Sequence, residues 1–270
     1  MKRIMLTVSY DGTAYCGWQW QPGVLTVEEA LNQELSRLLR EDIRVKGASR
    51  TDSGVHALGN LCVFDTETRI PPEKICFALN QSLPADIVVQ DSCEVPLSFH
   101  PRKCGSKKTY EYTIWNSRFP NPVNRRYVSW IHAPLDEKRM QEAAVCLVGE
   151  HDFKSFCSPR TEAETTVRRI LALSVRREGC CVILRVQGTG FLYNMVRIIA
   201  GTLIQVGRGA MPPERVAEIL AGSDRALAGP TAPPEGLCLM EISLDEDPWK
   251  ALKNKEIISE IPAENPPKNA

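Results

Sequence analysis

Residues 108–116 read KTYEYTIWN, a run whose side chains alternate as in a β-strand with one buried face. An amphipathic helix, two strands separated by Gly179, a long apolar helix and a closing strand follow it, at 135–149, 165–178, 181–188, 191–207 and 237–244. The second half of the chain is therefore predicted to run β-α-β-β-α-β. An extra helix is predicted at 212–222, before the last strand.

The first half of the chain predicts the same order of elements. A β-rich strand at 3–10 ends in the turn signal Asp11-Gly12. Thr26 and Glu29 form a capping box at the start of a helix with apolar periodicity. A short strand, a longer strand, a helix that begins with prolines and another strand follow, at 43–47, 61–66, 71–81 and 86–91. Two βαββαβ units in tandem predict an α+β fold built from two ferredoxin-like halves.

Three segments are expected along the chain. Residues 1–104 form an N-terminal α/β domain, and residues 105–246 form a C-terminal α/β domain. Residues 247–270 are polar and rich in proline, a composition that predicts partial disorder.

The composition excludes several classes of protein. The chain has 270 residues, of which 43% are hydrophobic and 24% are charged, so it can bury a core. Its formal net charge is zero, and any nucleic-acid site must therefore arise from local clusters of charge. No run approaches the roughly 18 apolar residues of a membrane span, and the first residues show no signal-peptide pattern. We expect a cytoplasmic protein without membrane contact.

The ten cysteines are interpreted as reduced thiols, most of them small core residues. They include no Cys-x-x-Cys pair, Cys180 and Cys181 begin an apolar strand, and the four histidines are widely scattered. This spacing predicts no metal site.

Residues 47–60, GASRTDSGVHALGN, place an arginine, an aspartate and a histidine between two predicted strands. Arg50 and Asp52 are two positions apart and point to the same side if the segment is extended. Asp52 could act as a nucleophile, a general base or a metal ligand. The alternative is a solvated, charged turn, which the composition alone favours. Gly54 argues against a helix that would pair His56 with Asp52, so we interpret His56 as structural.

Residues 99–115 combine basic and aromatic side chains. Arg102, Lys103, Lys107 and Lys108 precede three aromatic residues, a pattern typical of phosphate contact and base stacking. The alternative is a basic loop followed by aromatic residues of the core.

Arg197 lies in the middle of the apolar helix at 191–207. A buried guanidinium is costly unless a carboxylate pairs with it. Asp52 is a candidate partner, and such a pair would hold Asp52 ionised. The alternative is that the side chain extends to the surface.

Six stretches, taken together, resemble the TruA family of tRNA pseudouridine synthases. ASRTDSGVHA at 48–57 is similar to the family's GRTDAGVHA, with Ser49 in place of glycine and Ser53 in place of alanine. The others occur in the family's order: YDGTAYCGWQWQP (10–22), KKTYEYTIWN (107–116), HDFKSF (151–156), FLYNMVRIIAGTLIQVG (191–207) and EGLCLMEI (235–242). The resemblance runs from the first strand to about residue 244.

The resemblance assigns a role to each matched residue. Asp52 would be the essential catalytic aspartate, a nucleophile, and Arg50 would help to hold the extruded nucleotide. Tyr110 would pack on the target base, Arg197 would pair with the aspartate, and Leu237 would line the base pocket. The implied fold is the pseudouridine synthase fold, two α/β domains that share an extended antiparallel sheet.

The resemblance also implies a substrate and a reaction. The substrate would be tRNA, at uridines 38 to 40 of the anticodon arm, bound across a homodimer. The carboxylate could attack C1′ or C6, or remove the C2′ proton, and the sequence leaves these three routes open. No metal, nucleotide or redox cofactor is required. The candidates for RNA contact are the basic residues Arg102, Lys103, Lys107, Lys108, Arg125, Arg126, Arg160 and Arg168.

Two rival functions share part of this pattern. A non-catalytic RNA-binding protein with two RRM-like domains would share the βαββαβ order, but it would give Asp52 and Arg197 no role. A hydrolase or phosphatase with Asp52 as nucleophile would need more acids or a metal cluster, which the sequence does not offer.

Overall fold

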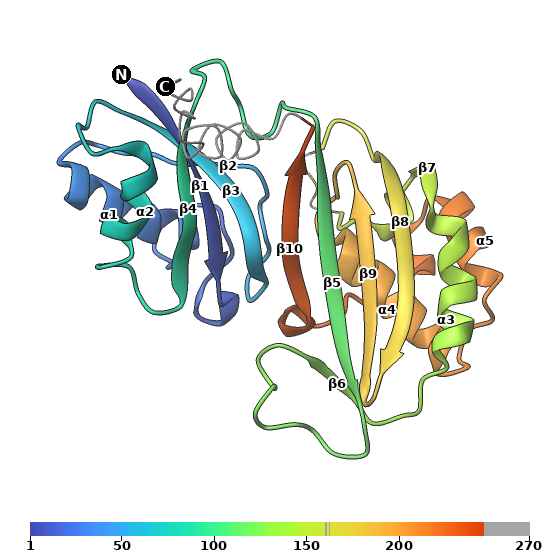
Figure 1. The fold of residues 1–270 in the computed structure, drawn as a ribbon. Coiled ribbons are helices and arrows are strands. Elements are labelled where there is room, and N and C mark those ends of the chain that lie inside the picture. Colours follow the sequence, from blue (N-terminus) through green and yellow to red (C-terminus); the bar gives the residue numbers. More distant parts are fainter. Residues whose placement is uncertain (160, 162, 246–270) are drawn as a thin grey trace, which may run out of the picture.

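The protein is described by a computed structural model that covers residues 1–159, 161 and 163–245 (Figure 1). The predicted disordered segment at 247–270 and the candidate residue Arg160 lie outside these described residues. The fold is α+β, as predicted, with a ten-stranded sheet that is mostly antiparallel. Helices α1 and α2 gather at the N-terminal half of the sheet, and α3, α4 and α5 gather at the C-terminal half.

The N-terminal half contains the predicted order of elements. Its strands are β1 (Lys2–Tyr10), β2 (Lys46–Gly47), β3 (His56–Thr66) and β4 (Ile87–Val95). Its helices are α1 (Val27–Leu39) and α2 (Ile75–Leu79), with 3-10 turns η1 (Gly12–Ala14) and η2 (Pro72–Lys74).

The C-terminal half repeats this order and adds two short strands and one helix. Its strands are β5 (Ser106–Asn116), β6 (Ser129–Ile131), β7 (Gly149–Asp152), β8 (Val167–Glu178), β9 (Cys181–Gly188) and β10 (Leu237–Leu244). Its helices are α3 (Glu137–Ala144), α4 (Met195–Gly207) and α5 (Arg215–Gly222). Its 3-10 turns are η3 (Val145–Leu147), η4 (Lys154–Phe156), η5 (Arg225–Leu227) and η6 (Pro234–Gly236).

The two halves share one sheet because β10 pairs with β3. The strand order is β4-β1-β3-β10-β5-β9-β8-β7, and β2 pairs with β3 off this path. β10 runs parallel to the start of β3, with Cys238 opposite His56, while β2 pairs with the middle of β3, with Lys46 opposite Val63. β10 also pairs with β5, with Leu239 opposite Tyr110. The loop between β2 and β3 therefore lies beside β5, at the seam of the two halves.

Several elements are shorter than predicted. The strand predicted at 43–47 is reduced to β2, because the amides of Ile43 and Val45 donate to side chains of α1, the Ser36 hydroxyl at 2.9 Å and the Asn32 carbonyl at 2.8 Å. The helix predicted at 135–149 begins at Glu137, after the N-cap Asp136, and gives way to η3.

Two further boundary differences lie near the seam. β3 begins at His56, five residues before the predicted strand, because Ala57 pairs with Tyr10 on one side and with Leu239 on the other. The helix predicted at 191–207 begins at Met195, after Asn194 takes a left-handed backbone conformation with φ of 61°.

The core follows the apolar faces of these elements. In α1, the Thr26 hydroxyl accepts from the Glu29 amide at 3.2 Å, which confirms the predicted N-cap, and Leu31 and Leu35 are fully buried. α4 is buried along most of its length and packs against α3 and β5. In the part of the chain that the structure describes, no helix is both long and apolar enough to cross a membrane.

Candidate active site

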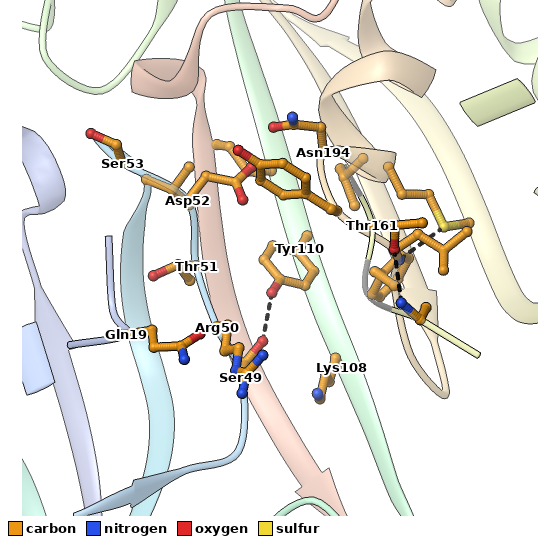
Figure 2. A pocket seen from close by; sticks show the side chains of 18 of the residues that line it. Gln19, Ser49, Arg50, Thr51, Asp52, Ser53, Lys108, Tyr110, Thr161 and Asn194 are labelled. Carbon is orange, nitrogen blue, oxygen red and sulfur yellow. Dashed lines mark hydrogen bonds between the residues drawn. The ribbon is translucent and has the colours of Figure 1, made fainter. Parts of the chain in front are cut away.

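A pocket of about 860 Å³ lies at the seam of the two halves (Figure 2). It is lined by the loop between β2 and β3, by one face of β5, and by the segment that leads into α4. Of the residues singled out in the sequence, it brings together Arg50, Asp52, Arg102, Lys108, Tyr110, Arg168 and Leu237.

The loop at 48–55 is fixed by the backbone of the segment that follows β1. The Trp18 amide donates to the Thr51 carbonyl at 3.1 Å, and the Gly54 amide donates to the Tyr15 carbonyl at 3.2 Å. The Ser53 hydroxyl also donates to the Tyr15 carbonyl, at 3.3 Å. The Asp52 backbone is therefore held on both sides by hydrogen bonds that do not use its side chain.

A buried network of polar side chains also holds the same loop, on the side that faces the core. The hydroxyls of Tyr10 and Thr51 are 2.7 Å apart. Asn60 donates to the Ser49 carbonyl at 2.9 Å and to the Tyr10 hydroxyl at 3.3 Å. Thr51 is thus anchored in the protein interior, and together with its neighbours Arg50 and Asp52 it lines the pocket.

Gly17 is required for this close approach. Its φ is +85°, and a Cβ built on it would lie 2.6 Å from the Thr51 carbonyl oxygen, closer than a carbon and an oxygen can pack. Gly23, in the same segment, has a similar φ of +77° but no atom within 4 Å of its built Cβ. A substitution at Gly23 tests only the strain of a positive φ, whereas the same substitution at Gly17 also displaces the loop that carries Asp52.

We expect Gly17→Ala to lower kcat by roughly 100-fold, because displacement of a catalytic group by about 1 Å can cost that much. Gly23→Ala is the matched control and should cost only about 1 kcal/mol of stability, the usual penalty for a non-glycine residue at positive φ. Turnover and thermal unfolding of both variants check this. Equal activity of the two variants would contradict the role given to Gly17.

Asp52 and Arg197 form an ion pair, with Nη1 of Arg197 at 3.3 Å from Oδ2 of Asp52. Their side chains are 18% and 15% exposed, respectively. Nη1 of Arg197 also donates to Oδ1 of the Asn194 side chain at 2.8 Å, and Nε donates to the Ala232 backbone carbonyl at 2.8 Å. The guanidinium is thus held at three points, and the predicted pairing is present, whereas the alternative of a side chain extended to the surface is not.

Arg197 favours the ionised form of Asp52, as predicted, but it does not set the net direction of the pKa shift. Burial raises the pKa of Asp52 above its ordinary value, and the charge and hydrogen bond of Arg197 lower it by less than burial raises it. Arg197 therefore limits the rise in the pKa of Asp52 without cancelling it. The carboxylate is kept poorly solvated, which favours its reaction with an electrophile or with a proton.

Tyr110 projects from β5 into the pocket, where its phenol hydroxyl lies 2.8 Å from the Ser49 hydroxyl. Its ring meets the Phe191 ring edge-on, with centroids 5.3 Å apart. Burial raises the pKa of Tyr110, so the phenol stays neutral at physiological pH. Leu237, at the start of β10, adds an apolar side chain to the same wall.

A sequence profile of the family described as tRNA pseudouridine synthase matches residues 6–102 and 143–245. The tRNA pseudouridine synthase A of Geotalea daltonii is 46% identical over 242 residues, which cover 90% of this chain and 99% of that protein. The enzyme of the same name from Citrifermentans bemidjiense is 47% identical over 247 residues, covering 91% and 99%. That of Brevibacillus brevis is 47% identical over 242 residues, covering 90% and 99%. The chain belongs to the tRNA pseudouridine synthase family.

His56 does not line the pocket of this family member. Its Nδ1 accepts from the Gly12 amide at 3.0 Å and lies 3.2 Å from Oδ1 of Asp11. Its ring lies against that of Tyr127, with centroids 5.1 Å apart. His56 fixes the start of β3 to the turn after β1, a structural position as the sequence predicted. In the described part of the chain, no group of three or more His, Cys, Asp or Glu side chains is placed to hold a metal ion.

The basic candidates separate into groups. Arg102, Lys108 and Arg168 line the pocket, whereas Lys103 and Lys107 are exposed and lie outside its lining. Arg125 and Arg126 line a second, smaller hollow with Thr13, Gly54, Pro234 and Glu235.

Sequence reasoning missed three residues whose hydrogen bonds hold the side chains of this candidate site. Asn194 and the Ala232 carbonyl hold the Arg197 guanidinium, and Ser49 holds the Tyr110 hydroxyl. An asparagine before an apolar helix is a capping signal, which could have marked Asn194 as the start of α4. The other two contacts join segments far apart in the sequence and have no local signal.

Proposed function

We propose that the chain isomerises uridine to pseudouridine at positions 38 to 40 of the tRNA anticodon arm, with Asp52 as the reacting carboxylate. Membership of the family supports the coarser activity: a tRNA pseudouridine synthase is an isomerase that acts on tRNA. The observation that carries the role of Asp52 is its poorly solvated carboxylate in a large pocket, paired with the single guanidinium of Arg197, whereas positions 38 to 40 rest on the resemblance to the family.

The reaction breaks the bond between N1 and C1′ of uridine, rotates the detached uracil, and joins C5 to C1′. The proton on C5 leaves to solvent, and N1 gains a proton, so the product has the formula of the substrate. Ionised Asp52 can attack C1′ or C6, or remove the C2′ proton, and each route needs a carboxylate without a proton. The base must first leave its stack to reach a carboxylate in a pocket.

The other residues of the pocket serve that extruded base. The neutral Tyr110 ring and Leu237 offer flat and apolar surface for the uracil to pack on. Arg50, on the rim of the pocket beside Asp52, is placed to contact the extruded nucleotide. A non-catalytic RNA-binding protein would have no use for a desolvated carboxylate in such a pocket, and this favours the isomerase.

Three further proposals rest on the resemblance to the family and on the sequence pattern. The chain acts as a homodimer that binds one tRNA across both subunits, it works in the cytoplasm, and its domains divide near residue 104. Sedimentation of the free protein and of its tRNA complex tests the first of these.

The assay for the reaction is release of tritium from tRNA labelled at uridine C5. We expect release from a transcript with uridine at positions 38 to 40, and loss of all site-specific release when those positions carry cytidine. Restoring uridine at one position at a time identifies the positions used. Release that persists without uridine at any of the three would contradict the assigned positions, and no release from any tRNA would contradict the activity.

A further inference from the structure

Three cations from separate segments meet in the pocket. Arg102 comes from the turn before β5, Lys108 from β5 itself and Arg168 from the start of β8, and all three line the cavity that contains Asp52. Lys108 lies two residues before Tyr110 on the strand, so both side chains project from the same face of β5.

No carboxylate in the described part of the chain forms an ion pair with any of the three. Lys108 donates to the Ala48 carbonyl at 2.9 Å, and Nη1 of Arg168 donates to the carbonyls of Thr165 at 2.9 Å and Val167 at 2.6 Å. These are neutral acceptors, which leave the charges uncompensated.

The three cations repel one another. Burial, and then the charges of Arg102 and Arg168, lower the pKa of Lys108 to about 8, although the nearby Cys104 thiol opposes the shift. Like charges gathered in a partly buried pocket destabilise the empty site, and an anion placed among them would relieve that repulsion. The cluster is therefore suited to bind a negative group.

The cluster lies at a useful distance from the reacting carboxylate. In Figure 2, Lys108 lies at one end of the pocket and Asp52 towards the other, with Tyr110 between them. Two residues along a strand span about 7 Å, comparable to the distance between the base and the phosphate of one nucleotide. A base packed on Tyr110 thus places an adjoining phosphate near Lys108.

We propose that Arg102, Lys108 and Arg168 form a subsite for a single phosphate that adjoins the extruded uridine. This inference rests on the proposed function and adds a requirement to it: the site recognises a phosphodiester-linked nucleotide rather than a free nucleoside. Lys103 and Lys107 lie outside the subsite. Lys107 is exposed, on the opposite face of β5 from Lys108, and makes a matched control.

The experiment combines Lys108→Met with a set of anticodon-arm RNAs. Each RNA carries a single neutral methylphosphonate, placed at one of the linkages that flank the target uridine. We expect wild type to lose roughly 10- to 100-fold in kcat/KM when one particular linkage is neutral, the usual size of a charge-assisted contact. Lys108→Met should lose a similar factor on unmodified RNA and almost nothing more on that neutral RNA. Lys107→Met should keep the full wild-type loss on that neutral RNA, whatever its activity on unmodified RNA.

Arg168→Met repeats the test from a different strand, in case loss of the contact with Ala48 disturbs folding. RNA binding measured by fluorescence anisotropy, with Asp52→Asn in the background, gives the same comparison without turnover. If the wild type isomerises no tRNA, the proposed function fails, and the binding comparison still tests the subsite. Additive effects of Lys108→Met and the neutral linkage, in turnover or in binding, would overturn the phosphate subsite. It would also be overturned if Lys107→Met removed the loss at the neutral linkage as Lys108→Met does.

Discussion

Asp52→Asn is expected to lower kcat by at least about 1,000-fold, the scale on which enzymes lose activity when the reacting group is removed. Asparagine has nearly the same shape and keeps an oxygen for Nη1 of Arg197, but it can neither attack carbon nor accept a proton at neutral pH. The loop itself should stay in place, because its hydrogen bonds run through the backbone of Thr51 and Gly54 and the side chain of Ser53.

Tritium release in single turnover measures the loss for Asp52→Asn, with tRNA binding followed separately. Asp42→Asn is the control, since that side chain is 82% exposed and its only ion pair in the described chain is with Arg44 at 3.4 Å. We expect Asp52→Asn to bind tRNA as wild type does and Asp42→Asn to retain full turnover. Substantial turnover by Asp52→Asn would exclude Asp52 as the reacting group.

The direction of the Asp52 pKa shift predicts how activity depends on pH, which is a second test of the role of Asp52. Because the ionised form reacts and burial raises its pKa, kcat/KM should fall on the acid side at a pH above the ordinary aspartate value of about 4. The same shift makes the stability of the folded protein depend on pH. The folded protein holds the Asp52 proton more tightly than the unfolded chain does, so this proton stabilises the fold below the pKa that Asp52 has in the unfolded chain. That stabilisation is lost as pH rises through the pKa of Asp52 in the folded protein. Asp52→Asn should therefore gain stability relative to wild type only at the higher pH.

Local chemistry explains why so much of the fold could be predicted. The alternation at 108–116 and the apolar run in α4 each determine one element, and the Thr26 N-cap fixes the start of α1. The duplicated βαββαβ order followed from these local signals, and the structure contains it. The Asp52 loop could be found because a short polar motif with three glycines lies between two strands.

Contacts between distant segments could not be predicted. β2 has only two residues, so the start of β3 has no β2 partner and pairs with β10 instead. This change of partner strand creates the seam on which the pocket lies. α4 approaches the segment before β10 closely because Gly201 has no side chain: a Cβ there would lie 1.8 Å from the Pro230 carbonyl oxygen. That approach brings the Ala232 carbonyl to Arg197. No periodicity or local propensity carries such information.

Arg197→Leu is expected to be the most destabilising of these substitutions, by about 3 kcal/mol, because removing one partner of a largely buried ion pair leaves the other charge unpaired. Leucine suits the apolar face of α4, so packing alone predicts little loss. The Ala232 carbonyl and the Asn194 side chain would also lose the donors that hold them. Denaturant unfolding and turnover measure the two effects separately.

Two further variants distinguish charge from shape. In Arg197→Leu the pKa of Asp52 should rise further, since Arg197 lowers it in the wild type, and the acid-side fall in kcat/KM should move to higher pH. Arg197→Lys keeps the charge but cannot reach Asp52, Asn194 and the Ala232 carbonyl together, so it should restore the pH profile more fully than the rate. Adding Asp52→Asn to Arg197→Leu removes the unpaired carboxylate and should recover part of the lost stability. If the double variant were no more stable than Arg197→Leu, the loss would come from packing of α4, and Arg197 would have no electrostatic role in holding the carboxylate.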